Sequence, residues 1–145
     1  MRFRKSAHAV YKTEYHVVWT PRYRRNLFSQ KGVKDYANKI LHNIENIEDD
    51  IEVIQVNVRP DHIHMVVVIP PRVSVARTVQ YIKTQSSGKI KSKFSFLQKA
   101  IWGRSGIWSR GYCVSSVGMS EKTILAYVTH QEKEDKGQLK LELGG

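Results

Sequence analysis

The feature that most restricts the fold is a pair of short apolar runs with almost no chain between them. The runs span Ile51–Val58 and Ile63–Ile69, and both are rich in β-branched residues, which favour strands. Between them lies only Arg59-Pro60-Asp61, whose proline and aspartate are typical of tight turns. We therefore predict a β-hairpin, and with it an antiparallel sheet.

Further strands and helices are predicted on both sides of this hairpin. Before the hairpin, a strand is predicted over Tyr11–Thr20 and a helix over about Gly32–Ile47. After it, a helix is predicted from its cap Ser74 to about Ser86, a strand over Gly111–Val117, and a last helix from Ser120 onward. This order is that of the ferredoxin-like or RRM-like βαββαβ fold, of class α+β, with an extra C-terminal helix. We expect a four- to five-stranded antiparallel sheet with helices on one face. The chain is expected to be a single domain over 1–145, with a polar tail, about 133–145, that frays.

Basic charge is concentrated in the middle of the chain. Lys and Arg number 24 against 13 Asp and Glu, a net charge of +11, and no Asp or Glu occurs from His62 through Ser120. A long basic stretch repels itself unless an anion neutralises it, and nucleic acid is the anion we favour. A solubilising surface and an anionic membrane surface are the alternatives.

Cysteine content and the length of the apolar runs exclude other classes of protein. The single cysteine, Cys113, excludes an internal disulfide framework and a zinc site built from several thiolates. No run is long enough to span a membrane and no signal peptide is evident, so we expect a cytoplasmic protein. The chain also lacks a phosphate-binding loop, a dinucleotide fingerprint and a serine-nucleophile motif.

Two histidines in the second strand of the hairpin form the first candidate site. His62 and His64 are two residues apart, so both side chains point to the same face of a strand. Two imidazoles so placed are able to hold one divalent cation. Ile63 and Met65 then point the opposite way, into the core. For an isolated pair of this kind, two half-exposed histidines without a ligand are the more common case.

The last predicted helix holds the second candidate site. Tyr127 and Gln131 are four residues apart, so they lie one above the other beside the apolar stripe of that helix. Taken alone, a tyrosine at the edge of the core and a solvated glutamine explain this spacing better.

A third candidate site is the segment Trp102–Tyr112, which interleaves aromatic residues with Arg and Gly. This mixture suits stacking on unpaired bases while Arg contacts phosphates, although the tryptophans are equally suited to the core. Together with the basic turn after the first strand and the basic residues after the hairpin, the residues predicted to bind nucleic acid are Arg22, Arg24, Arg25, Lys83, Lys89, Lys91, Lys93, Arg104, Trp108 and Arg110.

These segments occur in the order and spacing of the IS200/IS605 transposases, which the chain resembles over nearly its whole length. The matching segments are Tyr15–Arg25, Pro60–His64, Ile69–Pro71, Ser86-Ser87, Trp108–Tyr112, and Tyr127 with Gln131. The resemblance implies a single-tyrosine HUH transposase, in which His62 and His64 are the histidine–hydrophobic–histidine pair. Gln131 is then the third metal ligand and Tyr127 the nucleophile.

The resemblance also implies a substrate, a cofactor and an assembly. Such a transposase cuts and rejoins single-stranded DNA at the hairpin-bearing ends of an insertion sequence, through a 5′-phosphotyrosine. It uses Mg²⁺, which Mn²⁺ can replace, and it works as a homodimer in which one subunit's histidine pair meets the other's tyrosine helix. One alternative is an HUH relative or domesticated transposase that nicks DNA without mobilising itself. Another is a non-catalytic RRM-like nucleic-acid-binding module, which gives no reason for these four residues to occur together.

Overall fold

Four antiparallel strands form the sheet on which the chain is built. They are β3 (Glu14–Trp19), β4 (Glu52–Arg59), β5 (His62–Val68) and β6 (Cys113–Ser115), in the spatial order β4-β5-β3-β6. Every neighbouring pair is antiparallel. This computed structural model describes residues 3–5, 8, 10–22, 27–44, 47–95 and 106–116. Within them, the strand order confirms the predicted ferredoxin-like βαββαβ topology, with a sheet of four strands.

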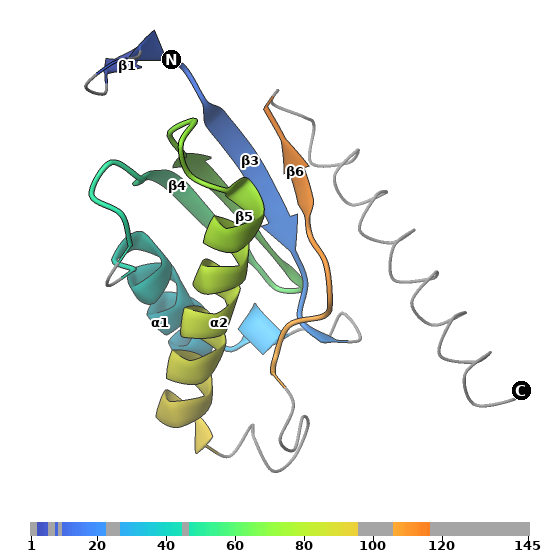
Figure 1. Ribbon diagram of the computed structural model, residues 1–145. Helices are drawn as coiled ribbons and strands as arrows, with labels where there is room; N and C mark the ends of the chain where they lie inside the picture. Colours follow the sequence, from blue (N-terminus) through green and yellow to red (C-terminus); the bar gives the residue numbers. More distant parts are fainter. Residues whose placement is uncertain are drawn as a thin grey trace, which may run out of the picture.

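Two helices cover one face of this sheet (Figure 1). They are α1 (Lys31–His42) and α2 (Val75–Lys93), and the short 3₁₀ helix η2 (Leu27–Ser29) precedes α1. A separate two-stranded ribbon is formed by β1 (Arg4–Lys5) and β2 (Val10–Tyr11). With both helices on one side, the residues of each strand divide into a helix-facing set and an outer set. None of the helices in the described ranges has the length and apolarity needed to cross a membrane.

The predicted hairpin is formed by β4 and β5, and its turn is Pro60-Asp61. A β-bulge between Val53 and Gln55 changes the alternation of β4. Because of this bulge, Val53, Val56 and Val58 all pack against the core, while the extra residue, Ile54, is 43% exposed.

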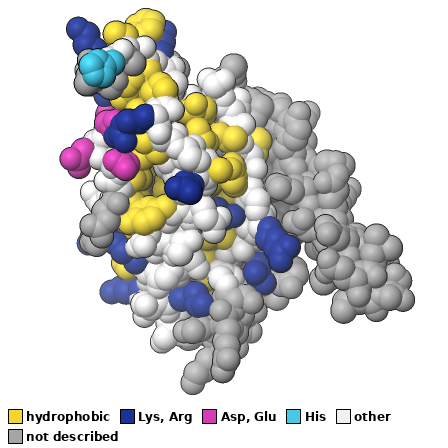
Figure 2. Space-filling model, viewed as in Figure 1, with side chains coloured by type: hydrophobic (Ala, Val, Ile, Leu, Met, Phe, Trp, Pro, Cys, Tyr) yellow, Lys and Arg dark blue, Asp and Glu magenta, His cyan; other side chains and the backbone are white. Residues whose placement is uncertain are grey.

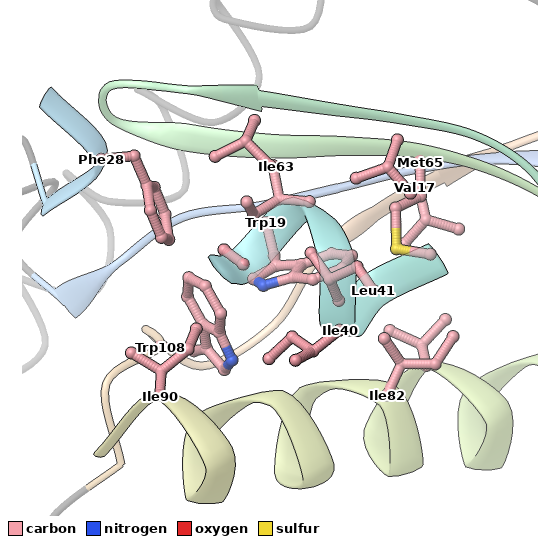
Figure 3. Close-up of a cluster of buried hydrophobic side chains, with 14 of the residues drawn as sticks. Val17, Trp19, Phe28, Ile40, Leu41, Ile63, Met65, Ile82, Ile90 and Trp108 are labelled. Carbon is pink, nitrogen blue, oxygen red and sulfur yellow. The ribbon is translucent and has the colours of Figure 1, made fainter. Parts of the chain in front are cut away.

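The core fills the space between the sheet and the two helices. In Figure 3, side chains from β3 and β5 point towards α2, with Ile40 and Leu41 of α1 among them. The sheet contributes Val17, Trp19, Ile63 and Met65, each at most 2% exposed. The prediction that Ile63 and Met65 face the core is thereby confirmed.

The first helix ends earlier than its apolar spacing predicts. We expected it to continue to Ile47, but α1 ends at His42, followed by the cap residue Asn43. The Asn43 backbone N–H donates to the carbonyl of Ile40, and its side-chain amide donates to the carbonyl of Lys39. Asparagine competes for backbone hydrogen bonds in this way, which favours helix ends over helix interiors.

The second helix begins where it was predicted and continues further. The Ser74 hydroxyl accepts a hydrogen bond from the backbone N–H of Arg77 at 3.2 Å, as an N-cap does. The helix then passes Ser86, where the prediction stopped, and reaches Lys93. The Ser86 hydroxyl does not interrupt the helix, because it bonds within the helix to the carbonyls of Ile82 and Lys83.

Two predicted strands are shorter than expected, and the C-terminal elements lie outside the described residues. The strand predicted over Tyr11–Thr20 is divided between β2 and β3, and among the described residues of the strand predicted over Gly111–Val117 only β6 is a strand. The predicted helix after Ser120 and the polar tail are not among the residues that the structure describes.

Candidate functional site

The central strand β5 places His62 and His64 together on the outer face of the sheet. Their neighbours Ile63 and Met65 lie in the core on the opposite face and are 0% exposed. The alternation of side chains along a strand therefore directs both imidazoles away from the helices, as predicted. His62 is 3% exposed and His64 is half-buried.

The ring of His62 is held by the residue that precedes it. Nδ1 of His62 lies 3.0 Å from a carboxylate oxygen of Asp61, which occupies the hairpin turn. A carboxylate accepts hydrogen bonds and does not donate them when ionised, so this contact favours the tautomer with the proton on Nδ1. The lone pair of that tautomer is on Nε2, the atom that is then able to bind a metal.

The ring of His64 contacts a histidine that the sequence analysis did not single out. Nε2 of His64 lies 3.3 Å from Nδ1 of His16, which is on β3, and the ring centroids are 5.5 Å apart. The register pairs Val18 with His64 and His16 with Val66, so the two histidines are diagonal neighbours on the outer face. Alternation along the predicted first strand indicates which face of the sheet His16 lies on. Only the register between β3 and β5 shows that its neighbour there is His64.

These imidazoles fit a metal site as far as the described residues go. His62 and His64 offer ring nitrogens to a divalent cation from one face of β5. The contact of His62 Nδ1 with the Asp61 carboxylate leaves Nε2 of His62 free of its proton, as a metal ligand requires. Among the residues that the structure describes, no three His, Cys, Asp or Glu side chains are grouped closely enough to hold a metal ion. The predicted third ligand, Gln131, and the predicted nucleophile, Tyr127, lie outside the described residues.

Two residues predicted to bind nucleic acid have buried side chains instead. Lys83 is 7% exposed, and its ammonium donates to the carbonyls of Ser109 and Gly111 at 2.9 and 2.8 Å. Burial lowers the pKa of Lys83 to about 8. Trp108 is 6% exposed, and its indole N–H lies 3.1 Å from the carbonyl of Lys83 and 3.0 Å from the hydroxyl of Ser86. Because both side chains are buried, neither contributes to a DNA-binding surface.

Together these contacts fix the segment that precedes β6 against the end of β3. Trp108 forms a β-bridge with Pro21 and packs edge-on against Trp19, with ring centroids 5.7 Å apart. The backbone N–H of Ser109 donates to the carbonyl of Thr20 at 3.0 Å, and the hydroxyls of these two residues are 2.7 Å apart. The aromatic and basic segment is therefore a structural anchor in the part that the structure describes.

The other predicted basic residues lie at or near the surface. Lys93 and Arg110 are exposed, while Lys89, Lys91 and Arg22 are half-buried. Figure 2 shows acidic side chains confined to one small area of the helix-covered face, whereas Lys and Arg are spread over it. Arg24, Arg25 and Arg104 lie outside the described residues.

A groove of about 560 Å³ runs between α1 and α2 and contains two of these lysines. Its lining residues come from one side of α2 and from one tyrosine of α1, and they are Tyr36, Thr84, Gln85, Gly88, Lys89, Ser92 and Lys93. The ammonium of Lys93 lies 5.8 Å from the centroid of the Tyr36 ring. Basic, aromatic and hydroxyl groups in one groove suit a phosphate backbone with unpaired bases.

Comparison with known proteins finds transposases. Residues 9–131 match the sequence profile of the family described as "Transposase IS200 like". The transposase for insertion sequence element IS200 of Salmonella typhimurium is 32% identical over 133 residues, which cover 90% of this chain and 84% of that protein. The ISDra2 transposase TnpA of Deinococcus radiodurans is 26% identical over 136 residues, covering 93% and 95%. A crystal structure of a Deinococcus radiodurans R1 protein assigned as a transposase has a TM-score of 0.73 and 28% identity, covering 90% of this chain and 96% of its own.

Proposed function

The chain belongs to the IS200-like transposase family, and from that membership we propose that it cuts and rejoins single-stranded DNA at the hairpin-bearing ends of an insertion sequence. The observation that carries the proposal is the placement of His62 and His64 on one face of the central strand, with His62 held by Asp61. Since the substrate would be the element's own DNA, we expect the enzyme to act in the cytoplasm.

In this proposal, the chain holds a divalent metal at the outer face of the sheet. His62 and His64 would provide two nitrogen ligands, and Gln131 would provide the third ligand. Mg²⁺ is the expected ion, with Mn²⁺ as a substitute, because both ions favour oxygen ligands such as an amide carbonyl and water. When bound, the metal supplies Lewis-acid chemistry, which polarises the scissile phosphate and offsets the charge that develops there.

Tyr127 is the proposed nucleophile. Its hydroxyl loses a proton and the oxygen attacks the phosphorus, the bond from phosphorus to the 3′-oxygen breaks, and the departing 3′-oxygen takes up a proton. The products are a 5′-phosphotyrosine and a free 3′-OH. The new bond conserves the energy of the original phosphoester, so attack by a second 3′-OH reverses the step and joins a new end without ATP. A tyrosine hydroxyl has an ordinary pKa of about 10, so its attack at neutral pH needs assistance in losing the proton.

The proposed DNA-binding surface consists of those basic residues predicted to bind nucleic acid that also reach solvent. In the described part of the chain these are Arg22, Lys89, Lys91, Lys93 and Arg110, and the groove between α1 and α2 contains two of them. The net charge of +11 attracts DNA to the whole molecule, and phosphate contacts of this kind position the strand without reading its sequence.

Replacing Tyr127 with phenylalanine tests the nucleophile. The change removes one hydroxyl and leaves the ring, so we expect folding and hairpin binding to persist while cleavage falls below detection. The assay incubates the protein with labelled single-stranded DNA from the flanks of its own gene and separates covalent adducts on a denaturing gel. A Tyr127→Phe protein that still forms the adduct would contradict the assignment.

The metal site is tested in the same assay. His62→Ala and His64→Ala, and chelation of the wild-type protein, should each abolish the adduct, while His42→Ala, a change of an exposed histidine on α1, should leave it intact. Full activity in chelator would refute the metal role. Joining of both element ends, measured with the same protein, distinguishes a transposase from a relative that only nicks DNA.

The proposed active unit is a homodimer with shared sites, and mixing two inactive variants tests it. If a site combines the histidines of one subunit with the tyrosine of the other, a Tyr127→Phe/His64→Ala heterodimer has one intact site and one with both defects. Activity should then reappear at up to about half the wild-type level per dimer, because one of two sites is intact. Sites built within one chain would leave the mixture inactive. Subunit exchange is verified first with differently tagged chains.

A further inference from the structure

We propose that Asp61 and His16 are positioning residues of the metal site, each binding one ring nitrogen of one histidine and fixing the direction in which that imidazole faces. The inference rests on the proposed function, since it takes His62 and His64 as the metal ligands. Neither Asp61 nor His16 is among the ligands or nucleophiles proposed above.

The contact between Asp61 and His62 has the form that orients metal-binding histidines in other proteins. Such a histidine usually donates its second ring N–H to a carboxylate, a carbonyl or a water, which sets the tautomer and makes the ligand more basic. Here the carboxylate lies 3.0 Å from Nδ1. The His62 side chain is 4% exposed and that of Asp61 is 26% exposed, so the contact is largely shielded from solvent. Shielding strengthens such a hydrogen bond.

Burial also prevents the His62 ring from turning to a different orientation. The interior is close-packed, so rotating an imidazole that is 4% exposed requires its neighbours to move. Asp61 is held in turn by its position in the two-residue turn between β4 and β5. The hairpin therefore provides both the ligand and the group that orients it.

The contact between His16 and His64 has the same role for the second ligand, but it comes from another strand. Nδ1 of His16 lies 3.3 Å from Nε2 of His64, and the rings are tilted by 34°. For His64 to bind a metal while it contacts His16, Nε2 of His64 must donate to Nδ1 of His16, which leaves the lone pair on Nδ1 of His64 for the metal. Pairing between β3 and β5 holds both backbones in place, and His64 lies beside Val18 in that register.

The experiment measures metal binding directly, with Mn²⁺ as the probe and electron paramagnetic resonance to count the free ion in solutions of the complete chain. Asp61→Ala and His16→Phe should each weaken Mn²⁺ binding about 10-fold or more, as losses of such orienting partners do. Asp61→Asn and His16→Asn should recover part of the affinity, because each amide again offers a polar atom to the ring. Asp35→Asn and His42→Phe are matched controls at exposed positions of α1 and should bind as wild type does.

A second measurement separates orientation of the ring from general stability. In ¹⁵N-labelled protein, two-dimensional NMR of the imidazole nitrogens identifies which nitrogen carries the proton. His62 should have its proton on Nδ1 in the wild-type protein and in the controls, and it should shift towards Nε2 in Asp61→Ala. Circular dichroism and the melting temperature are measured on the same variant. If both stay unchanged while the proton of His62 shifts, Asp61 orients the ring, because a residue that only stabilises the fold would leave the proton on Nδ1.

The outcomes distinguish failure of this inference from failure of the proposed function. If Asp61→Ala and His16→Phe bind Mn²⁺ like wild type while His64→Ala loses it, the positioning roles are wrong and the metal site stands. If only one of the two responds, the role of the silent residue is overturned. If His62→Ala and His64→Ala both bind Mn²⁺ as tightly as wild type, the metal is not held here and both proposals fall.

Discussion

At the scale of single residues, Lys83 gives a prediction about pH. Burial lowers the pKa of its ammonium to about 8, from an ordinary value of 10.5. As the pH rises through 8, the folded chain loses this proton while the unfolded chain keeps it, so the unfolded chain binds more protons. The free energy of unfolding should then rise with pH, by at most about 1.4 kcal/mol per pH unit from this residue.

The comparison that isolates this effect uses Lys83→Met, measured by urea denaturation between pH 7 and pH 9. The wild-type protein should gain stability relative to the variant as the pH rises across this window. Other groups titrate in both proteins and cancel in the difference. Parallel stability curves would show that Lys83 titrates normally in the folded state.

The site residues were predictable to different degrees, for physical reasons that Lys83 and His16 illustrate. His62 and His64 were found because alternation within one strand is a local property of the sequence. His16 was not, because its contact depends on pairing between β3 and β5, 48 positions apart along the chain. Lys83 was counted as a surface cation, although it follows Ile82 and lies four residues after Val79, on the buried side of α2.

At the scale of elements, the start of α2 gives a second prediction. Ser74 caps the helix by accepting from the backbone N–H of Arg77. Ser74→Ala should lower the free energy of unfolding by about 1 kcal/mol, the usual cost of losing a serine cap. Chemical denaturation measures this change. Ser92→Ala, in the last turns of the same helix and exposed, is the control, and it should be neutral or slightly stabilising because alanine favours helix interiors. Equal effects of the two changes would contradict the capping role.

The ends of elements were the least predictable part of the fold. Apolar spacing continues through Ile44 and Ile47, and both side chains do pack against the core, but from the loop that follows α1. Spacing records which residues are buried, whereas the Asn43 cap decides where the helix stops. The order of strands and helices was predictable, because a β-hairpin and two helices that connect strands of one sheet can be packed together in only a few compact ways.

At the scale of the whole molecule, the distribution of charge predicts how DNA binding depends on salt. Each neutralised phosphate of a single strand contributes about −0.7 to the slope of log affinity against log salt concentration. Lys89→Gln and Lys93→Gln, at the groove between α1 and α2, should each make the slope shallower by about this amount. Fluorescence anisotropy with a labelled hairpin measures it at several salt concentrations.

Lys34→Gln on α1 is the matched control, since it removes one exposed positive charge that does not line the groove. It should lower the affinity slightly through the overall field and leave the slope nearly unchanged. If all three variants change the slope equally, the attraction is that of the net charge alone, and the groove is not the place where phosphates bind.

The position of β5 within the sheet has a consequence for how the molecule opens. β4 pairs with one edge of β5 and β3 with the other, so the backbone amides of His62–Val68 are protected on both sides. Amide hydrogens in such a strand exchange with solvent only in the rare openings that disrupt the whole domain. The segment that carries the proposed ligands is then among the last to exchange, even without metal. The metal would bind to a strand that is already folded, and its release between catalytic cycles would leave the chain folded and able to bind metal again.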